Sequence, residues 1–290
     1  MAPSPDQAVG ENIADAVPSS SHGKRGRGKR TTSESERAAK LPRAPVEETK
    51  APEEDNTETP TTNVEEERDT QNTPAANTTE NIVKLLSNLS SDDPAIIADS
   101  LVDLGNLCAH DLTDLSVANE REIRRLGLHT AVVQVVKKHV DDALIQEEGI
   151  GALLNFTFST LAQVLVGDIG GVEVILAGMK RHPDNANIQW WGCGAIGNLL
   201  YETKRNAERL EESDGIAAVI AAMKVHPNNE EVQCNSCYAI WRMCEWAEYR
   251  HLIVAAGGLV TIAKAMEKYI GNPRVREESR RALQSLTKSD

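Results

Sequence analysis

Two short motifs in this sequence have residue types and spacings that could do chemistry. The run GCGAIG, from Gly192 to Gly197, matches the pattern G-x-G-x-x-G, whose glycines let a strand-to-helix turn approach the pyrophosphate of a dinucleotide. Cys234 and Cys237 form a C-x-x-C pair, the spacing of redox-active dithiols and of half a zinc site. They raise two hypotheses, a nucleotide-dependent enzyme and a thiol or zinc centre.

Three histidines form another candidate set. His139, His182 and His226 lie 43 and 44 residues apart, an interval that indicates equivalent places in a repeated structure. Imidazoles placed in this way could bind a metal or respond to pH. The chain has no second cysteine pair at metal-ligand spacing, and it has no Ser/His/Asp, Cys/His or paired-carboxylate set that favours catalysis.

The elements that must position these residues also repeat along the chain. Four stretches begin with a β-branched apolar residue, at Ile145, Ile188, Val232 and Val275, in steps of 43, 44 and 43 residues. In each stretch apolar or small residues recur at offsets 0, 4, 7, 8 and 11, which trace one side of an α-helix. A period in the forties predicts a solenoid, in which stacked units bury stripes that no unit can bury alone.

Each unit is predicted to contain three helices. In one copy a brief helix, 206–213, ends at Gly215, a short helix covers 216–226, and a long helix covers 230–247. Pro227 marks the break between the last two, because proline lacks an N–H and clashes with the preceding turn. The same break recurs at Pro183 and Pro273.

A first unit is detectable but degenerate. Its long helix begins with Asp93 as N-cap and Pro94 at the first helical position. Asp103 stands where the other units have alanine, and the distance to the next unit grows to 49 residues, which we assign to a loop insertion at 111–119. The apolar stripe keeps the common offsets, with Ile96, Ser100, Leu104 and Leu107.

The repeat gives each chemical motif a structural interpretation. The glycine run lies in the middle of a predicted helix and aligns with GIGALLN and SCYAIWR in the adjacent units, neither of which could hold a phosphate. Helical glycines cost roughly 0.5 to 1 kcal/mol each relative to alanine, so we expect Gly192 to lie against a neighbouring helix. Cys237 aligns with Cys193, which indicates packing, and the histidines close the short helices near their negative ends. We therefore expect no enzyme, no cofactor and no metal.

Composition separates a tail from a folded domain. Residues 1–79 are dominated by Pro, Thr, Ser, Glu, Asn and Ala, while every aromatic residue lies between Phe156 and Tyr269. We expect 1–79 to be disordered and 80–290 to form the repeat domain. The net charge of −13 argues against nucleic-acid binding by the folded part, and five cysteines without a signal peptide or an apolar anchor indicate reduced thiols in the cytoplasm or nucleus.

The units resemble armadillo repeats. The strings GGVEVILAGMKRHPDNANIQWWGCGAIGNLL, from Gly170, and GIAAVIAAMKVHPNNEEVQCNSCYAIW, from Gly215, carry the Gly, Pro, Gln, Ala and Leu positions of that family in consecutive units, and the resemblance covers roughly Asn81 to Lys288. It is closest to arrays like the armadillo region of leucine-rich-repeat kinases, with no kinase segment. The resemblance implies an all-α fold, a right-handed solenoid of about four to five repeats whose third helices line a concave groove.

The same resemblance implies where a partner would bind. In armadillo proteins offset 10 of the long helix is commonly the asparagine that pairs with a bound peptide's backbone, and here that offset holds Asn106, Asn155, Asn198, Arg242 and Ser285. Nuclear-import receptors of the family place tryptophan four residues earlier, whereas this chain has Val102, Gly151, Gly194, Tyr238 and Arg281. That departure argues against classical recognition of import signals.

The predicted groove is acidic and aromatic, which would favour a basic ligand segment, and offsets 3, 6, 10 and 13 to 14 lie to one side of the buried stripe. Aromatic residues are frequent interface hot spots, and acids such as Asp99, Glu202 and Glu278, together with Trp246, share this face. Long helices about 8 to 10 Å apart give a groove on the order of 40 Å, enough for about a dozen extended residues. The predicted partner-binding residues are Glu148, Asn155, Trp191, Asn198, Tyr201, Asn235, Tyr238 and Arg242.

The function that follows is a non-enzymatic, monomeric scaffold that binds a protein or an extended peptide, with no membrane partner. The tail offers an alternative, because its basic run resembles a nuclear import signal and could also occupy the groove of its own chain, as in a nuclear-transport adaptor. About 50 residues of linker give a coil dimension of roughly 35 to 42 Å, so such self-occupancy is sterically possible. The run consists of Lys24, Arg25, Arg27, Lys29 and Arg30.

Overall fold

The structure of the protein is a computed structural model that describes residues 74–107 and 121–288. Its described residues form α-helices without any strand, which confirms the all-α solenoid. The basic run, most of the predicted tail and the predicted insertion at 111–119 lie outside the described residues. The helices are α2 (Pro74–Asn88), α3 (Pro94–Leu107), α5 (Leu128–Lys138), α6 (Ala143–Phe156), α7 (Thr160–Asp168), α8 (Gly171–Arg181), α9 (Ala186–Leu199), α10 (Lys204–Glu212), α11 (Gly215–Val225), α12 (Glu230–Met243), α13 (Ala247–Ala255), α14 (Gly258–Lys268) and α15 (Pro273–Leu286).

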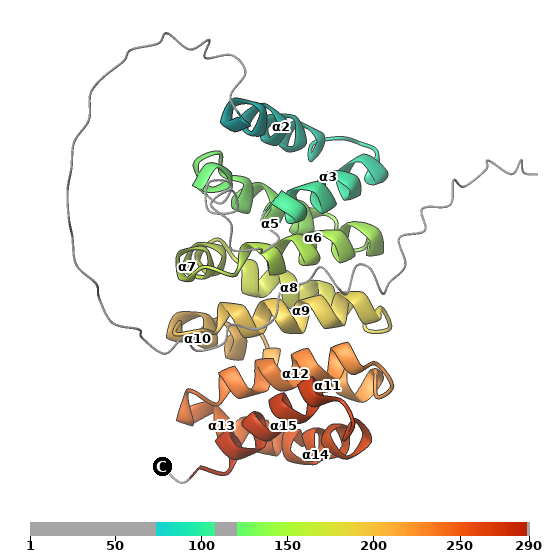
Figure 1. Cartoon of the computed structure of the whole chain (residues 1–290), viewed down its shortest axis with the longest axis vertical. Coiled ribbons are helices and arrows are strands. Elements are labelled where there is room, and N and C mark those ends of the chain that lie inside the picture. The colour runs from blue at the N-terminus through green and yellow to red at the C-terminus, as the bar shows by residue number, and fades with distance from the viewer. Residues whose placement is uncertain (1–73, 108–120, 289–290) are drawn as a thin grey trace, which may run out of the picture. The chain divides into compact units, whose positions relative to one another are not determined.

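The helices form rows of equivalent elements. The long helices α3, α6, α9, α12 and α15 contact one another in that order, and the short helices α5, α8, α11 and α14 form a second row (Figure 1). The brief helices α7, α10 and α13 precede the short ones. The predicted stripe is the core, because Ile188, Ala195 and Leu199 are fully buried.

Two helix boundaries and one buried position differ from the sequence prediction. Helix α2 begins at Pro74, inside the segment assigned to the tail. Helix α12 ends at Met243 rather than at 247, because the Arg250 side chain donates a hydrogen bond from Nε to the carbonyl of Cys244, 3.1 Å away. In the first unit Ile96 is 42% exposed and Ile97 is buried instead, because only α2 and α6 pack extensively against α3.

Asparagine and aspartate side chains cap the long helices, as the sequence predicted for Asp93. The carboxylate of Asp93 accepts a hydrogen bond from the backbone N–H of Ala95 at 2.9 Å. Asn185 and Asn229 do the same for α9 and α12. These caps satisfy amide groups that have no partner within the helix, so each break between a short and a long helix is fixed locally.

A buried glutamine at the second position of the stripes of α6, α9 and α12 closes the preceding short helix. Gln189 donates from Nε2 to the carbonyls of Met179 and His182, at 2.9 and 3.0 Å. Gln146 and Gln233 make the equivalent pairs of bonds in their units. The last carbonyls of a helix lack intrahelical partners, so these amides satisfy groups that the fold buries.

We expect Gln189→Leu to destabilise the stack by about 2 kcal/mol, because two buried carbonyls lose their donor. That loss corresponds to a melting temperature lower by roughly 4 to 8 °C for a domain of this size. The matched control is Gln134→Leu, since Gln134 is an exposed glutamine on α5. Thermal unfolding that moved equally in both variants would contradict the capping role.

The histidines connect successive units. His182 and His226 are the C-cap residues of α8 and α11, and their Nε2 atoms lie 2.7 Å from the carbonyls of Val140 and Pro183 in the preceding unit. Tyr269 takes the same place after α14, and its hydroxyl donates to a carbonyl at 3.3 Å. This confirms a structural role for His182 and His226 at the end of the short helix and adds a bond to the preceding unit.

Among the described residues no single helix is long and apolar enough to cross a membrane; only α7 and α8 taken together pass by length and composition, and they are bent by 73°.

Candidate functional site

The candidate site is the face formed by one side of α6, α9, α12 and α15 and the turns that follow them, called here the long-helix face. It has buried and half-exposed positions. Trp191, Asn198, Tyr238 and Arg242 are each at most 6% exposed. The half-buried predicted residues are Glu148, Asn155, Tyr201 and Asn235.

Large side chains on this face lie over glycines of the preceding unit. A Cβ added at Gly151 would be 3.0 Å from the ring of Trp191, so the indole lies directly against the bare backbone of α6. Asn235 lies over Gly194 in the same way, and its Nδ2 donates to the carbonyl of Trp190 at 3.2 Å. Glycine thus stands where import receptors have tryptophan, because the side chain of the next unit fills that space.

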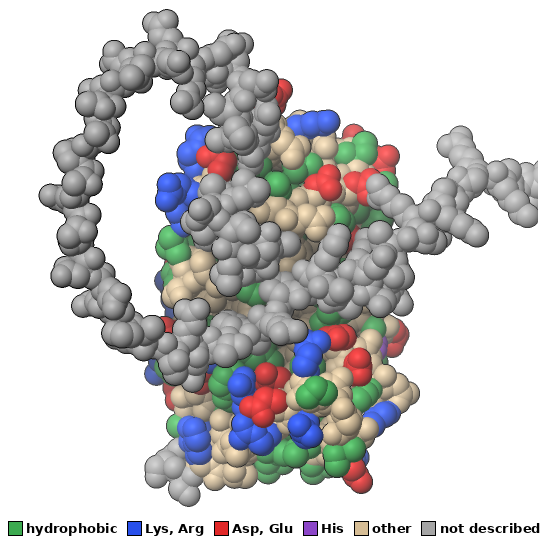
Figure 2. All heavy atoms as spheres, in the orientation of Figure 1, with side chains coloured by type: hydrophobic (Ala, Val, Ile, Leu, Met, Phe, Trp, Pro, Cys, Tyr) green, Lys and Arg blue, Asp and Glu red, His purple; other side chains and the backbone are tan. Residues whose placement is uncertain are grey.

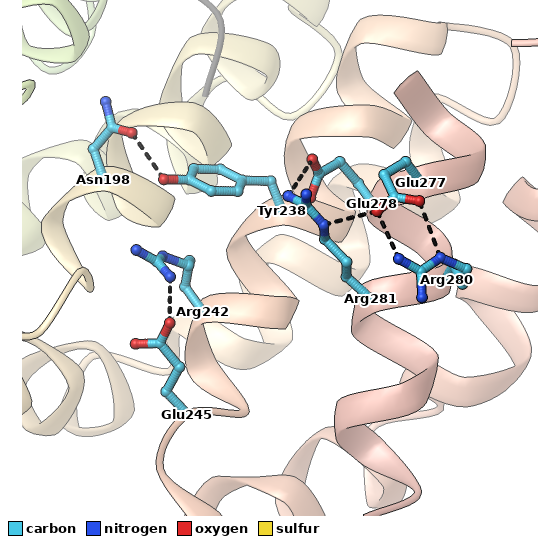
Figure 3. A network of polar contacts seen from close by, with 8 residues as sticks. All are labelled: Asn198, Tyr238, Arg242, Glu245, Glu277, Glu278, Arg280 and Arg281. Atoms are coloured by element: carbon cyan, nitrogen blue, oxygen red, sulfur yellow. Dashed lines mark hydrogen bonds and ion pairs between the residues drawn. The ribbon is translucent and has the colours of Figure 1, made fainter. Parts of the chain in front are cut away.

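The asparagines predicted at offset 10 bridge adjacent layers. Asn155 donates from Nδ2 to the carbonyl of Gly105 on α3, at 3.2 Å. Asn198 donates to Thr157 Oγ1 at 3.3 Å and accepts a hydrogen bond from the Tyr238 hydroxyl at 3.1 Å (Figure 3). Both ends of the Asn198 amide are therefore used inside the stack, while Asn155 keeps an acceptor atom. Their contact with a partner stays a prediction.

Arg242 lies inside an aromatic cage. Its guanidinium is 4.2 Å from the ring centre of Tyr201, 4.7 Å from that of Trp241 and 5.9 Å from that of Tyr238. Glu245, in the turn after α12, forms an ion pair with it (Figure 3). A buried cation is stabilised by the faces of aromatic rings and by a carboxylate, so this cage rigidifies the turns after α9 and α12.

The charge of the face differs from the expected acidic character. Arg281 of α15 lies 4.9 Å from the ring centre of Trp241, on which Arg242 also lies, and it pairs with Glu277 and Glu278 at 3.0 and 3.4 Å. Acidic and basic side chains are intermingled over the layers of α12 to α15 (Figure 2). The sequence did not indicate that Trp241 and Arg281 stack, because they stand at different offsets, 9 from Val232 and 6 from Val275.

Two adjacent carboxylates of α15 differ in their environments. Hydrogen bonds from Arg280 lower the pKa of Glu277 to about 2. Burial raises the pKa of Glu278, which is only 9% exposed. The positive charge of Arg281 opposes that shift (Figure 3). A raised pKa means that the folded state holds its proton more tightly than the unfolded state.

We expect Glu278→Gln to change how stability depends on pH. Because the pKa of Glu278 is raised in the folded state, binding of its proton stabilises the fold. This stabilisation is fully present below the ordinary pKa of 4.5 and is lost as pH rises through the folded-state pKa. Glutamine does not titrate, so the melting temperature of the variant relative to that of wild type should rise as the pH increases from 4 to 8. A constant difference across that range would contradict a buried, strained carboxylate.

Five polar atoms on this face are buried without a hydrogen-bond partner. Four of them lie one on each consecutive long helix: Asn155 Oδ1 on α6, Trp191 Nε1 on α9, Arg242 Nε on α12 and Glu278 Oε2 on α15. The fifth is Trp246 Nε1, in the turn after α12. A buried polar atom left unpaired costs about 1 to 3 kcal/mol, so such atoms require an explanation.

The glycine motif does not form a nucleotide site. Gly192 to Gly197 lie within α9, which follows a turn and no strand, and all six residues are buried. An added Cβ at Gly192 would be 2.6 Å from Met179 Sδ on α8, which confirms the expected close approach, and one at Gly197 would collide with the Tyr238 ring. The three glycines of α9 are thus explained by packing on α8 and α12.

Cys234 and Cys237 do not form a reactive centre. Burial raises the pKa of Cys234 and Cys237 to about 12, so neither is a thiolate at neutral pH. Cys237 Sγ lies 3.4 Å from Ser279 Oγ on α15, a contact between layers. In 74–107 and 121–288 no three His, Cys, Asp or Glu residues are grouped so that they could hold a metal.

Comparisons with known proteins identify the fold. No family model matches the sequence, and no curated protein matches it. A designed armadillo repeat protein superposes with a TM-score of 0.52 at 15% identity, over 71% of this chain and 100% of the designed one. An engineered protein from a structural genomics consortium gives 0.53 at 19% identity, over 71% and 96%. The chain therefore has an armadillo-like helical repeat fold.

Proposed function

We propose that the long-helix face binds an extended segment of another protein, so that the chain acts as a scaffold. The observation that carries this proposal is the row of four unpartnered polar atoms, one on each of four consecutive long helices. Long helices pack about 8 to 10 Å apart, and an extended chain advances about 3.3 Å per residue. Each unit then corresponds to about three residues of the ligand.

The chemistry of the four atoms matches a peptide backbone. Asn155 Oδ1 and Glu278 Oε2 accept hydrogen bonds, whereas Trp191 Nε1 and Arg242 Nε donate them. A backbone offers N–H donors and C=O acceptors in alternation, so one extended strand can satisfy both kinds. Such contacts are independent of ligand side chains, which are selected instead by the neighbouring half-exposed residues Tyr201, Asn235 and Trp241.

Peptide selection against the full chain tests this proposal. A displayed library of twelve-residue peptides is selected, and the bound peptides are then truncated one residue at a time. We expect affinity to fall in steps over a stretch of about nine to twelve residues, because several units are engaged. Binding that needs only three or four residues would contradict an extended ligand.

The same assay separates the two same-fold hypotheses. A synthetic peptide that contains the basic run from Lys24 to Arg30 is added as competitor. If the chain is an adaptor that its own tail occupies, this peptide should displace the selected ones, and removal of residues 1–73 should strengthen their binding. A general scaffold predicts neither effect.

A further inference from the structure

A pocket lies on the row of short helices, between α11 and α14. Its volume is about 450 Å³, within the range of about 300 to 1,000 Å³ typical of small-molecule sites. Its apolar lining comes from Met223, Pro227, Val260 and Ala265, and Gln233 of α12 also lines it. The pocket contains none of the unpartnered atoms of the long-helix face.

Three lysines also line this pocket, without any acidic residue among the lining side chains. Lys224 donates from Nζ to the carbonyl of Ala256 at 3.4 Å, and Lys268 donates to Asn228 Oδ1. Lys264, exposed on α14, completes the set. Each of the two bonded ammonium groups meets a neutral oxygen, so the lining as a whole carries positive charge with no compensating carboxylate.

The preceding unit shows what a neutral version of this groove looks like. Between α8 and α11, Lys180 takes the place of Lys224, donates to the carbonyl of Ser213 at 2.7 Å and pairs with Asp214 at 3.7 Å. The position of Asp214 is taken by Gly257 before α14. A Cβ added at Gly257 would be 3.9 Å from Lys224 Nζ, so an aspartate there would lie beside the lysine.

The two added lysines have uncharged equivalents as well. Aligning α14 on α11 places Lys264 at the position of Ala221 and Lys268 at the position of Val225. The last groove has therefore lost an acid and gained two bases relative to its neighbour, while it keeps apolar walls. Positive charge over an apolar pocket favours a ligand with an anionic head and an apolar body.

We propose that this pocket binds a small anionic amphiphile, a molecule with a carboxylate or phosphate group on a short hydrocarbon body. The lysines hold the head group, and the body lies against Met223 and Val260. The pocket is large enough to enclose such a body, so the proposed ligand is a free molecule rather than a membrane surface.

Methyl NMR of the full chain tests this proposal, with decanoate as the probe below its micelle concentration. We expect saturable shifts of the Met223 and Val260 methyl signals. Neutral 1-decanol should bind at least about tenfold more weakly, because it lacks the charge that the lysines attract. Decyltrimethylammonium should leave these signals unchanged, and inorganic phosphate should bind more weakly than decanoate.

Variants that copy the neighbouring unit supply the control. The double variant Lys264→Ala, Lys268→Val introduces the residues of α11, and Gly257→Asp separately introduces the counter-ion that precedes α11. Each variant should lower the affinity for decanoate by about tenfold while the circular dichroism spectrum stays unchanged. Gly257 has a φ of 89°, whereas the equivalent Asp214 has a φ of 54°, so aspartate at Gly257 requires the backbone to shift towards the conformation of Asp214. Equal binding of decanol and decanoate, no saturable shift, phosphate binding as tightly as decanoate, or unchanged affinity in both folded variants would overturn the proposal.

Discussion

Gly192→Leu should lower the melting temperature of the protein by roughly 6 to 12 °C. A Cβ at this position would be 2.6 Å from Met179 Sδ and 3.5 Å from Ile175 Cγ2, and leucine adds further atoms beyond it. Overpacking of a filled core costs about 1 to 3 kcal/mol, and a site between two helices is at the upper end because α8 or α9 must move. For a domain of this size each kcal/mol corresponds to roughly 2 to 4 °C.

A glycine in a turn provides the matched control. A Cβ at Gly271, between α14 and α15, would have no atom within 4 Å, so Gly271→Leu should stay within about 2 °C of wild type. Both variants are compared by thermal unfolding followed by circular dichroism. Equal stability of Gly192→Leu and wild type would show that α8 and α9 do not approach closely at this point.

The second large effect concerns binding. We expect Asn155→Ala and Trp191→Phe each to weaken every selected peptide by about tenfold, because each removes one hydrogen bond to the ligand backbone, worth about 1.4 kcal/mol. The loss should be similar for peptides of unrelated sequence. A loss confined to one peptide sequence would instead indicate a side-chain contact.

An exposed residue away from the long-helix face controls for general effects. Ile270, which follows α14, is 70% exposed, and Ile270→Ala should leave peptide affinity unchanged. Thermal stability is measured for each variant, since Trp191 also covers Gly151. Asn155→Ala removes no comparable ring, but it also removes the hydrogen bond to the Gly105 carbonyl, so its affinity is compared at a temperature where both it and wild type are fully folded.

The fold could be predicted because the same apolar offsets recur in every unit and form the core. Ile145, Ile188, Val232 and Val275 share one offset, and all four are fully buried. A helix that must bury the same offsets in every unit can only stack on its neighbours. The start of a long helix was predictable for a local reason, because an Asp or Asn side chain caps its own first turn.

Features that depend on other units were not predictable. The end of α12 is set by Arg250, and no glycine or proline marks it. Ile96 satisfies the stripe pattern but remains 42% exposed, because burial at the first unit depends on which helices cover it. Local sequence rules describe one helix at a time, whereas these positions depend on contacts between helices.

The helical offsets predicted which residues share one face but not the contacts between them. In the structure Tyr238 bonds to Asn198, and Trp191 lies against Gly151 of α6. Sequence reasoning did not pair Trp191 with Gly151, since the two residues are 40 positions apart and the pairing requires the register of α9 on α6. It also did not predict that Arg242 lies inside an aromatic cage.

The indole N–H signals of the full chain give the most direct measurement of the central claim, that an extended backbone pairs with atoms on the long-helix face. The chain has four tryptophans, so a ¹H–¹⁵N spectrum contains four such signals, which single Trp→Phe variants assign. On addition of a selected peptide the account predicts a downfield shift of the Trp191 Nε1–H signal, as this buried donor gains an acceptor. A peptide that binds tightly while the Trp191 signal stays in place would contradict it.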